Sequence, residues 1–149
     1  IYMGDWSSDV CSSDLGWKNW GLDVNDDSVV LLIEYGAFRA VLAGDAGLAT
    51  EAEIRRKVGR VDLLKVGHHG SAHSSGDAWL AELRPRVGIV SVGRNRYGHP
   101  APSALARLRA HGAEIWRTDE QGSITVLTDG RSVEVKGRKG ASQFLAGGS

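Results

Sequence analysis

Histidines and an acidic residue occur at three places where a short polar stretch follows an apolar run. Asp45 lies in LAGD, His68 and His69 lie in KVGHHGSAHSS, and His99 lies in RYGHP. Carboxylate oxygens and imidazole nitrogens are ligands that zinc, manganese and iron accept, and one carboxylate can bridge two metal ions. These residues are therefore candidates for a divalent metal site.

Each candidate also has an explanation that involves no chemistry. Asp45 follows a glycine and could form a turn or cap the next helix. His99 could be an ordinary loop histidine before Pro100, and the stretch around His68 and His69 could be a turn rich in glycine and serine. The positions of the neighbouring elements decide between these interpretations.

The elements that must position these residues alternate between strands and helices. Strands are predicted for the apolar, β-branched runs at 28–35, 37–43, 61–66, 87–92, 114–116, 123–127 and 132–136. Helices are predicted at 48–58, 77–83 and 103–112. Gly36 splits the first two strands and TDGR joins the last two, so each pair is expected to form a hairpin. The alternation predicts an α/β fold.

The candidate residues follow three successive predicted strands. His68 lies 23 residues after Asp45, and His99 lies 30 residues after His69, so each interval holds about one strand–helix unit. In layered α/β proteins ligands bind at the carboxyl ends of the strands, because the sheet holds the loops while solvent reaches them. Neighbouring parallel strands could therefore bring these residues together.

Composition is that of a folded globular domain. The chain has 149 residues, of which 42% are hydrophobic and 24% charged. No stretch approaches the roughly 18 consecutive apolar residues that a membrane helix needs, and the pattern of a signal peptide is missing. The formal net charge is zero, which gives no general attraction to nucleic acid or to membrane surfaces.

The segment DWSSDVCSSDL at 5–15 differs from the rest of the chain. It resembles a translated sequencing adapter, and the alternative is a natural tail rich in serine and aspartate. Leaving it out removes Cys11 and lowers the acidic count from 18 to 15, so the net charge becomes about +3. We interpret 1–15 as an artefact, 16–137 as a partial domain, and 138–149 as a flexible tail.

The motifs VLAGDA, VDLLKVGHHGSAHSS, VGRNRYGHPAPSALARL and GAEIWRTDEQGSITV occur in this order. They resemble the later half of the metallo-β-lactamase-fold domain of ComEC-type DNA-uptake proteins and their soluble relatives, from about Asn25 to about Val126. The resemblance implies the second half of an αββα sandwich, a mixed sheet with flanking helices. It also implies hydrolysis of an ester, amide or phosphodiester with divalent zinc or manganese. A ComEC-type protein would be membrane-associated, with this domain outside the cytoplasm.

The resemblance implies roles for the candidate residues. Asp45 would be a bridging metal ligand and His99 the last metal-ligating histidine. His68 and His69 would be catalytic residues beside the substrate phosphate, and either one could donate a proton to the leaving group. Ser71 belongs to the same HHGS signature and would contact the substrate.

Basic residues near these motifs would suit a phosphodiester or other anionic substrate, possibly DNA. Lys65, Arg94 and Arg96 lie within a few residues of the candidate site, although each could be ordinary surface charge. The sequence does not by itself demonstrate nucleic-acid binding, because the tryptophans show no recognisable stacking pattern; they are Trp17, Trp20, Trp79 and Trp116.

One departure from the family is informative. The main metal motif of this fold, His-x-His-x-Asp-His, does not occur in the sequence. Asp45 and His99 alone are too few ligands for a catalytic centre, which normally takes three or more from the protein. We therefore expect this chain alone to be inactive, and two metal ions in an intact protein.

Two other functions fit the same residues. One is a soluble esterase with the same fold. The other is a phosphate- or nucleotide-binding α/β module without catalysis, in which the glycines of LAGDAG and VGHHGS bind an anion through backbone amides. The sequence leaves the oligomeric state open.

Overall fold

The computed structural model describes residues 2–3 and 28–145. The strands are β1 (Tyr2–Met3), β2 (Leu31–Tyr35), β3 (Phe38–Leu42), β4 (Leu63–Lys65), β5 (Val87–Val90), β6 (Glu114–Arg117), β7 (Ile124–Thr128), β8 (Val133–Gly137) and β9 (Ser142–Leu145). The helices are α1 (Leu48–Val58), α2 (Asp77–Leu83), α3 (Pro102–Ala110) and α4 (Thr118–Gln121), with a 3₁₀ turn η2 (Gly67–Gly70). The adapter-like segment 5–15, Trp17 and Trp20 lie outside the described residues.

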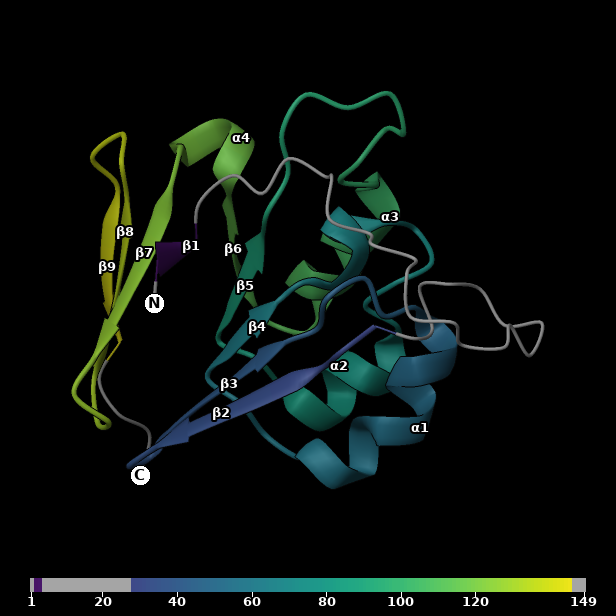
Figure 1. The fold of residues 1–149 in the computed structure, drawn as a ribbon, viewed down its shortest axis with the longest axis horizontal. Helices are drawn as coiled ribbons and strands as arrows, with labels where there is room; N and C mark the ends of the chain where they lie inside the picture. The colour runs from purple at the N-terminus through teal and green to yellow at the C-terminus, as the bar shows by residue number, and fades with distance from the viewer. Residues whose placement is uncertain (1, 4–27, 146–149) are drawn as a thin grey trace, which may run out of the picture.

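Two sheets and one layer of helices make up the fold (Figure 1). The five-stranded sheet has the order β2-β3-β4-β5-β6; β2 pairs antiparallel with β3, and the other strands run parallel. The four-stranded sheet has the order β1-β7-β8-β9 and is antiparallel. The predicted α/β class, with a mixed sheet and flanking helices, is confirmed.

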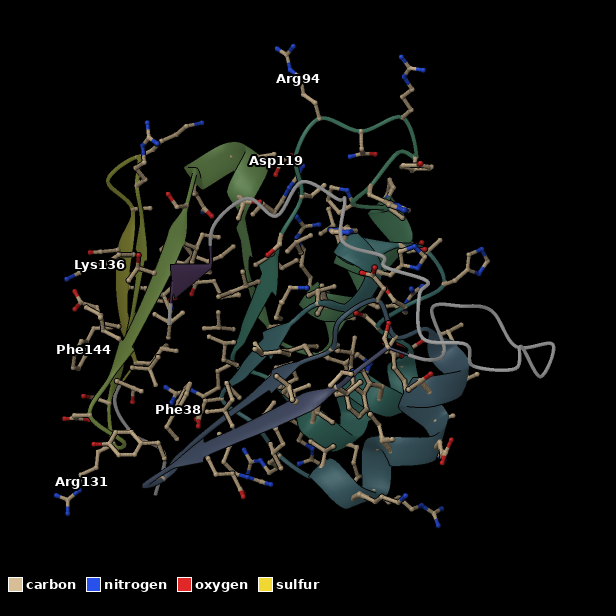
Figure 2. All side chains as sticks on the ribbon, in the orientation of Figure 1. Phe38, Arg94, Asp119, Arg131, Lys136 and Phe144 are labelled. Carbon is tan, nitrogen blue, oxygen red and sulfur yellow. The ribbon has the colours of Figure 1, made fainter. Side chains whose placement is uncertain are left out.

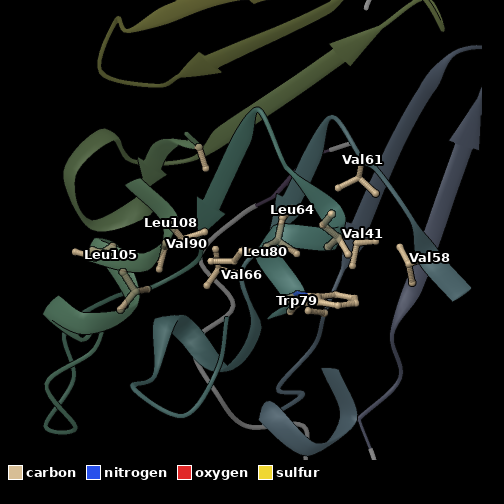
Figure 3. Close-up of a cluster of buried hydrophobic side chains, with 14 residues drawn as sticks. Val41, Val58, Val61, Leu64, Val66, Trp79, Leu80, Val90, Leu105 and Leu108 are labelled. Carbon is tan, nitrogen blue, oxygen red and sulfur yellow. The ribbon is translucent and has the colours of Figure 1, made fainter. Parts of the chain in front are cut away.

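The central strands of the five-stranded sheet are buried on both faces, whereas the edge strand β2 is largely exposed. On one face Val41, Leu64 and Val90 pack with residues of α1, α2 and α3 in a single hydrophobic cluster (Figure 3). On the other face Ala40, Leu63 and Ile89 pack against the four-stranded sheet. Because successive side chains of a strand point to opposite faces, the central strands need apolar residues at nearly every position. This is why they appear in the sequence as continuous apolar runs.

The layers of the described residues are therefore helix, sheet and sheet. Helices α1, α2 and α3 contribute to the same cluster on one face of the five-stranded sheet, and the four-stranded sheet covers the other face. The four-layer αββα sandwich that the resemblance implies remains a prediction. None of the helices in 28–145 is long and apolar enough to cross a membrane.

Helices α1 and α2 have the predicted bounds, whereas α3 begins one residue and ends two residues before the prediction, and α4 was not predicted. α1 ends at Gly59, which adopts φ 68° and so continues the chain in a conformation that costs little only for glycine. α3 begins with Pro102 in its first turn, where the missing N–H would have had no partner within the helix.

The carboxyl-terminal region differs from the expectation. The sequence predicts a flexible tail from residue 138, whereas Ser142–Leu145 forms β9 and pairs antiparallel with β8. Gly140 reverses the chain with φ 96°, and Leu145 packs against the cluster between the sheets. The short alternation in SQFL, only four residues long, gave too weak a strand signal beside the glycines and charges around it.

Candidate functional site

Three loops meet at the carboxyl edge of the parallel strands, as the sequence predicts. Asp45 follows β3, His68 and His69 lie in η2 after β4, and His99 lies in the loop between β5 and α3. The last residues of β3 and β4 are in register, with Leu42 opposite Lys65. The sheet therefore presents these loops side by side.

The double histidine occupies an unusual backbone conformation. His68 and His69 have φ of 48° and 53°, in the left-handed region that side chains other than glycine rarely adopt. The His68 N–H donates to the Gly44 carbonyl at 3.0 Å, which ties this turn to the Asp45 loop. The Ser71 N–H donates back to the His68 carbonyl at 2.9 Å.

His69 has a defined tautomer. Its Nδ1 lies 2.7 Å from the Ser91 carbonyl oxygen, and since a carbonyl only accepts, Nδ1 must carry the proton. The other ring nitrogen, Nε2, lies 3.7 Å from Oδ1 of Asp45. Ser91 thus orients the ring so that it faces the carboxylate.

His99 lies against His68. Their rings meet edge to face with centroids 5.6 Å apart. Nδ1 of His99 is buried and finds no hydrogen-bond partner among the described residues. Burial lowers the pKa of His99, and the neighbouring His68 and His69 lower it further. A lowered pKa favours the neutral ring, and an unpaired nitrogen of a neutral imidazole can bind a metal ion.

The loop that carries His99 is fixed by two side chains that the sequence analysis did not single out. The Thr118 hydroxyl accepts the Val92 N–H at 2.7 Å and donates to the Val92 carbonyl at 2.8 Å. Oδ1 of Asn95 accepts the N–H groups of Tyr97 and His99, at 3.1 and 3.0 Å. Its Nδ2 donates to the carbonyls of Gly93 and His99, at 3.0 and 2.8 Å. An asparagine four residues before a loop histidine was the available signal.

Two charged side chains, Glu51 and Arg107, hold the segment 72–76, which follows the double histidine. The Glu51 carboxylate accepts the N–H of Ser75 at 2.6 Å and that of Gly76 at 2.8 Å. The Arg107 guanidinium donates to the carbonyls of Ser75, Ala72 and Ser74. Burial raises the pKa of Glu51 to about 7, against the opposing effects of these two N–H groups and of Arg107. Neither residue carried a sequence signal, because their partners lie 24 to 35 residues away.

The residues expected to contact substrate differ in how far solvent reaches them. Lys65 is near enough to Asp45 to interact with its charge; burial lowers the pKa of Lys65 and Asp45 opposes that effect. Arg94 and Arg96 are exposed on the loop between β5 and α3. Ser71 is buried, and its hydroxyl accepts the His73 N–H at 3.2 Å, a contact within the loop. Trp79 and Trp116 are buried in the two clusters.

The fit to a metal ion is partial. Within 28–145, no group of three or more His, Cys, Asp or Glu side chains could hold a metal ion. The contacts join Asp45 to His69 and His99 to His68. The exposed Asp45 carboxylate and the unpaired Nδ1 of His99 are suitable donors, but two donors do not make a centre. The expected metal therefore remains a prediction that needs further ligands.

Comparison with known proteins gives three relatives, and no protein-family model matches the chain. The chain is 39% identical over 103 residues to ComE operon protein 3 of Bacillus subtilis and 36% identical over 103 residues to Recombination protein 2 of Haemophilus influenzae. It is 34% identical over 107 residues to Competence protein ComA of Neisseria gonorrhoeae.

These matches cover 67 to 69% of this chain but only 13 to 16% of the relatives. The chain thus spans a small part of the length of the proteins that it matches. Over that part, the expected resemblance to ComEC-type competence proteins is supported by all three relatives, and the chain is a homologue of one segment of them.

Proposed function

We propose that this chain contributes one side of a metal-dependent phosphodiesterase site that acts in DNA uptake. The observation that carries the proposal is the convergence of Asp45, His68, His69 and His99 at one sheet edge, with a buried, unpaired nitrogen on His99. The similarity to competence proteins gives the biological setting.

Asp45 and His99 are proposed as metal ligands, completed by donors that the described residues do not supply. When bound, divalent zinc or manganese would bring the pKa of a water molecule toward neutrality and offset charge on phosphate oxygens. The side chains of this segment then bind and orient the substrate.

The geometry supports different roles for the two adjacent histidines. The Ser91 carbonyl holds Nδ1 of His69, and Nε2 lies 3.7 Å from Oδ1 of Asp45, so we assign His69 the role of a positioning residue beside the carboxylate. His68 lies edge-on to His99, and we assign it the contact with the leaving-group oxygen, to which it donates a hydrogen bond or a proton. Lys65, Arg94 and Arg96 would bind phosphate oxygens.

A chimera tests the proposal. The 103 matched residues of ComE operon protein 3 are replaced by those of this chain, and hydrolysis of bis(4-nitrophenyl) phosphate is followed with added Mn²⁺ or Zn²⁺. We expect metal-dependent hydrolysis that falls by about 100-fold or more in Asp45→Asn and His99→Ala, a larger loss than outer-shell partners usually cause. Glu53→Gln, an exposed carboxylate on α1, is the matched control. The 149-residue chain alone should show no hydrolysis.

Two results would contradict the proposal. One is hydrolysis that needs no metal or that survives Asp45→Asn. The other is metal-independent phosphate binding without hydrolysis, which would indicate the non-catalytic module. If the chimera does not fold, NMR spectra of the 149-residue chain replace it: added Mn²⁺ should broaden the signals of Asp45 and His99 before those of Glu53.

A further inference from the structure

Tyr97 is the most exposed of the large hydrophobic residues described, with 83% of its surface accessible. It lies two residues before His99, on the same loop. The two rings are stacked, with centroids 5.9 Å apart and planes inclined by 23°. One face of the phenol ring therefore rests on a residue of the candidate site, and most of the rest of the ring is open to solvent.

The backbone holds this tyrosine in place. Asn95 accepts the N–H of Tyr97 and the N–H of His99 on a single oxygen, and its amide closes the loop onto the Gly93 and His99 carbonyls. The start of the loop is fixed by Thr118 at Val92. An aromatic ring on such a loop is ordered before any ligand arrives, which reduces the entropic cost of binding.

Two arginines precede the exposed ring in the sequence. Arg94 and Arg96 are exposed, and the segment 93–101 contains no Asp or Glu. Figure 2 shows Arg94 at the outer end of this loop, projecting away from the body of the molecule. An exposed aromatic face on a loop with cationic side chains is a combination that binds a base together with neighbouring phosphates.

We propose that Tyr97 is a base-stacking residue and that Arg94 and Arg96 bind neighbouring phosphates, so that the site takes a single-stranded polynucleotide. The strand is single because base faces are accessible to a protein ring only where they are not stacked within a duplex. The buried tryptophans Trp79 and Trp116 could not supply such a surface. This inference rests on the proposed function and names its substrate class and a specificity-determining residue.

The test is a binding assay without metal, using the 149-residue chain and a fluorescent twelve-nucleotide oligothymidylate. Tyr97→Ala should weaken binding by about 5- to 150-fold, the range that corresponds to 1–3 kcal/mol for one stacked base. Tyr97→Phe should remain within about twofold, because the ring is kept. The control is Tyr35→Ala, which removes an exposed tyrosine at the opposite edge of the five-stranded sheet.

An abasic oligonucleotide of the same length separates stacking from charge. Tyr97→Ala should have no effect on its binding. Arg94→Ala and Arg96→Ala should weaken binding of both oligonucleotides, and each should reduce the slope of log K against log salt by about 0.7.

Three results would overturn the inference: no measurable binding of oligothymidylate, unchanged binding in Tyr97→Ala, or an equal loss on the abasic strand. None of these bears on the metal-dependent hydrolysis of bis(4-nitrophenyl) phosphate, which rests on Asp45 and His99. Failure of the stacking residue is therefore distinguishable from failure of the proposed function.

Discussion

At the scale of single residues, the two glycines that bracket the double histidine have distinct packing roles. A Cβ on Gly67 would lie 2.8 Å from the Ala46 carbonyl oxygen, and one on Gly70 would lie 2.8 Å from Cβ of Pro100. The Ala101 N–H donates to the Gly70 carbonyl at 2.8 Å. The HHG turn therefore lies directly against the loop that carries His99, and this close approach brings the histidines together.

Glu51 gives a prediction about pH. Its pKa in the folded protein is about 7, against an ordinary value of 4.5, because burial disfavours the carboxylate. The folded state therefore holds a proton that the unfolded state loses between these two values. The contribution of Glu51 to stability is fully present below pH 4.5 and is lost as the pH rises through 7, by up to about 3 kcal/mol.

Urea unfolding at pH 5 and pH 8 checks this prediction. The free energy of unfolding should fall between the two values by more in the wild-type protein than in Glu51→Gln, which cannot ionise. The difference between the two proteins cancels most contributions from other titrating groups. An equal pH dependence in both would show that Glu51 remains ionised throughout.

At the scale of elements, strands and helices were predictable because their periodicities are local. The predicted strands at 61–66 and 87–92 contain the shorter β4 and β5, and the helix predicted at 77–83 matched α2. Topology followed too, since alternating elements place the ends of parallel strands at one edge. The contacts that shape the loops were not predictable: Glu51 and Arg107 reach partners 24 to 35 residues away, and no periodic pattern marks them.

Arg107 connects helix α3 to the loop 71–76 after the double histidine, and its removal should loosen that loop. Arg107→Ala leaves the carbonyls of Ala72, Ser74 and Ser75 without their charged donor, which we expect to cost about 2 kcal/mol of unfolding free energy. Hydrogen exchange of the amides in 71–76 should also speed up. Arg109→Ala is the matched control, because Arg109 is an exposed arginine two residues further along the same helix. Equal protection of these amides in both variants would contradict the role of Arg107 in holding this loop.

At the scale of the whole molecule, two separate hydrophobic clusters pack on the two faces of the sheet whose loops carry the site. One joins the five-stranded sheet to α1, α2 and α3, and the other joins the two sheets. The second cluster depends on residues after β6, which the sequence analysis identified as short strands without assigning them a partner sheet. The pattern of a strand shows which of its side chains are apolar but not the surface against which they pack. The layer formed by the four-stranded sheet was therefore visible only in the structure.

Strand β7 allows the sheet-on-sheet layer to be tested within one element. Ile124 is fully buried in the cluster between the sheets, whereas Leu127 is 47% exposed three positions later. Ile124→Ala should lower the free energy of unfolding by about 2–5 kcal/mol, because it leaves a cavity between two sheets that cannot both relax. Leu127→Ala, a change of similar size, should cost less than about 1 kcal/mol, since water already reaches that side chain. Urea unfolding of both variants measures the contrast. Equal losses would mean that a further layer covers the outer face of β7, because only burial on both faces would make the two side chains equivalent.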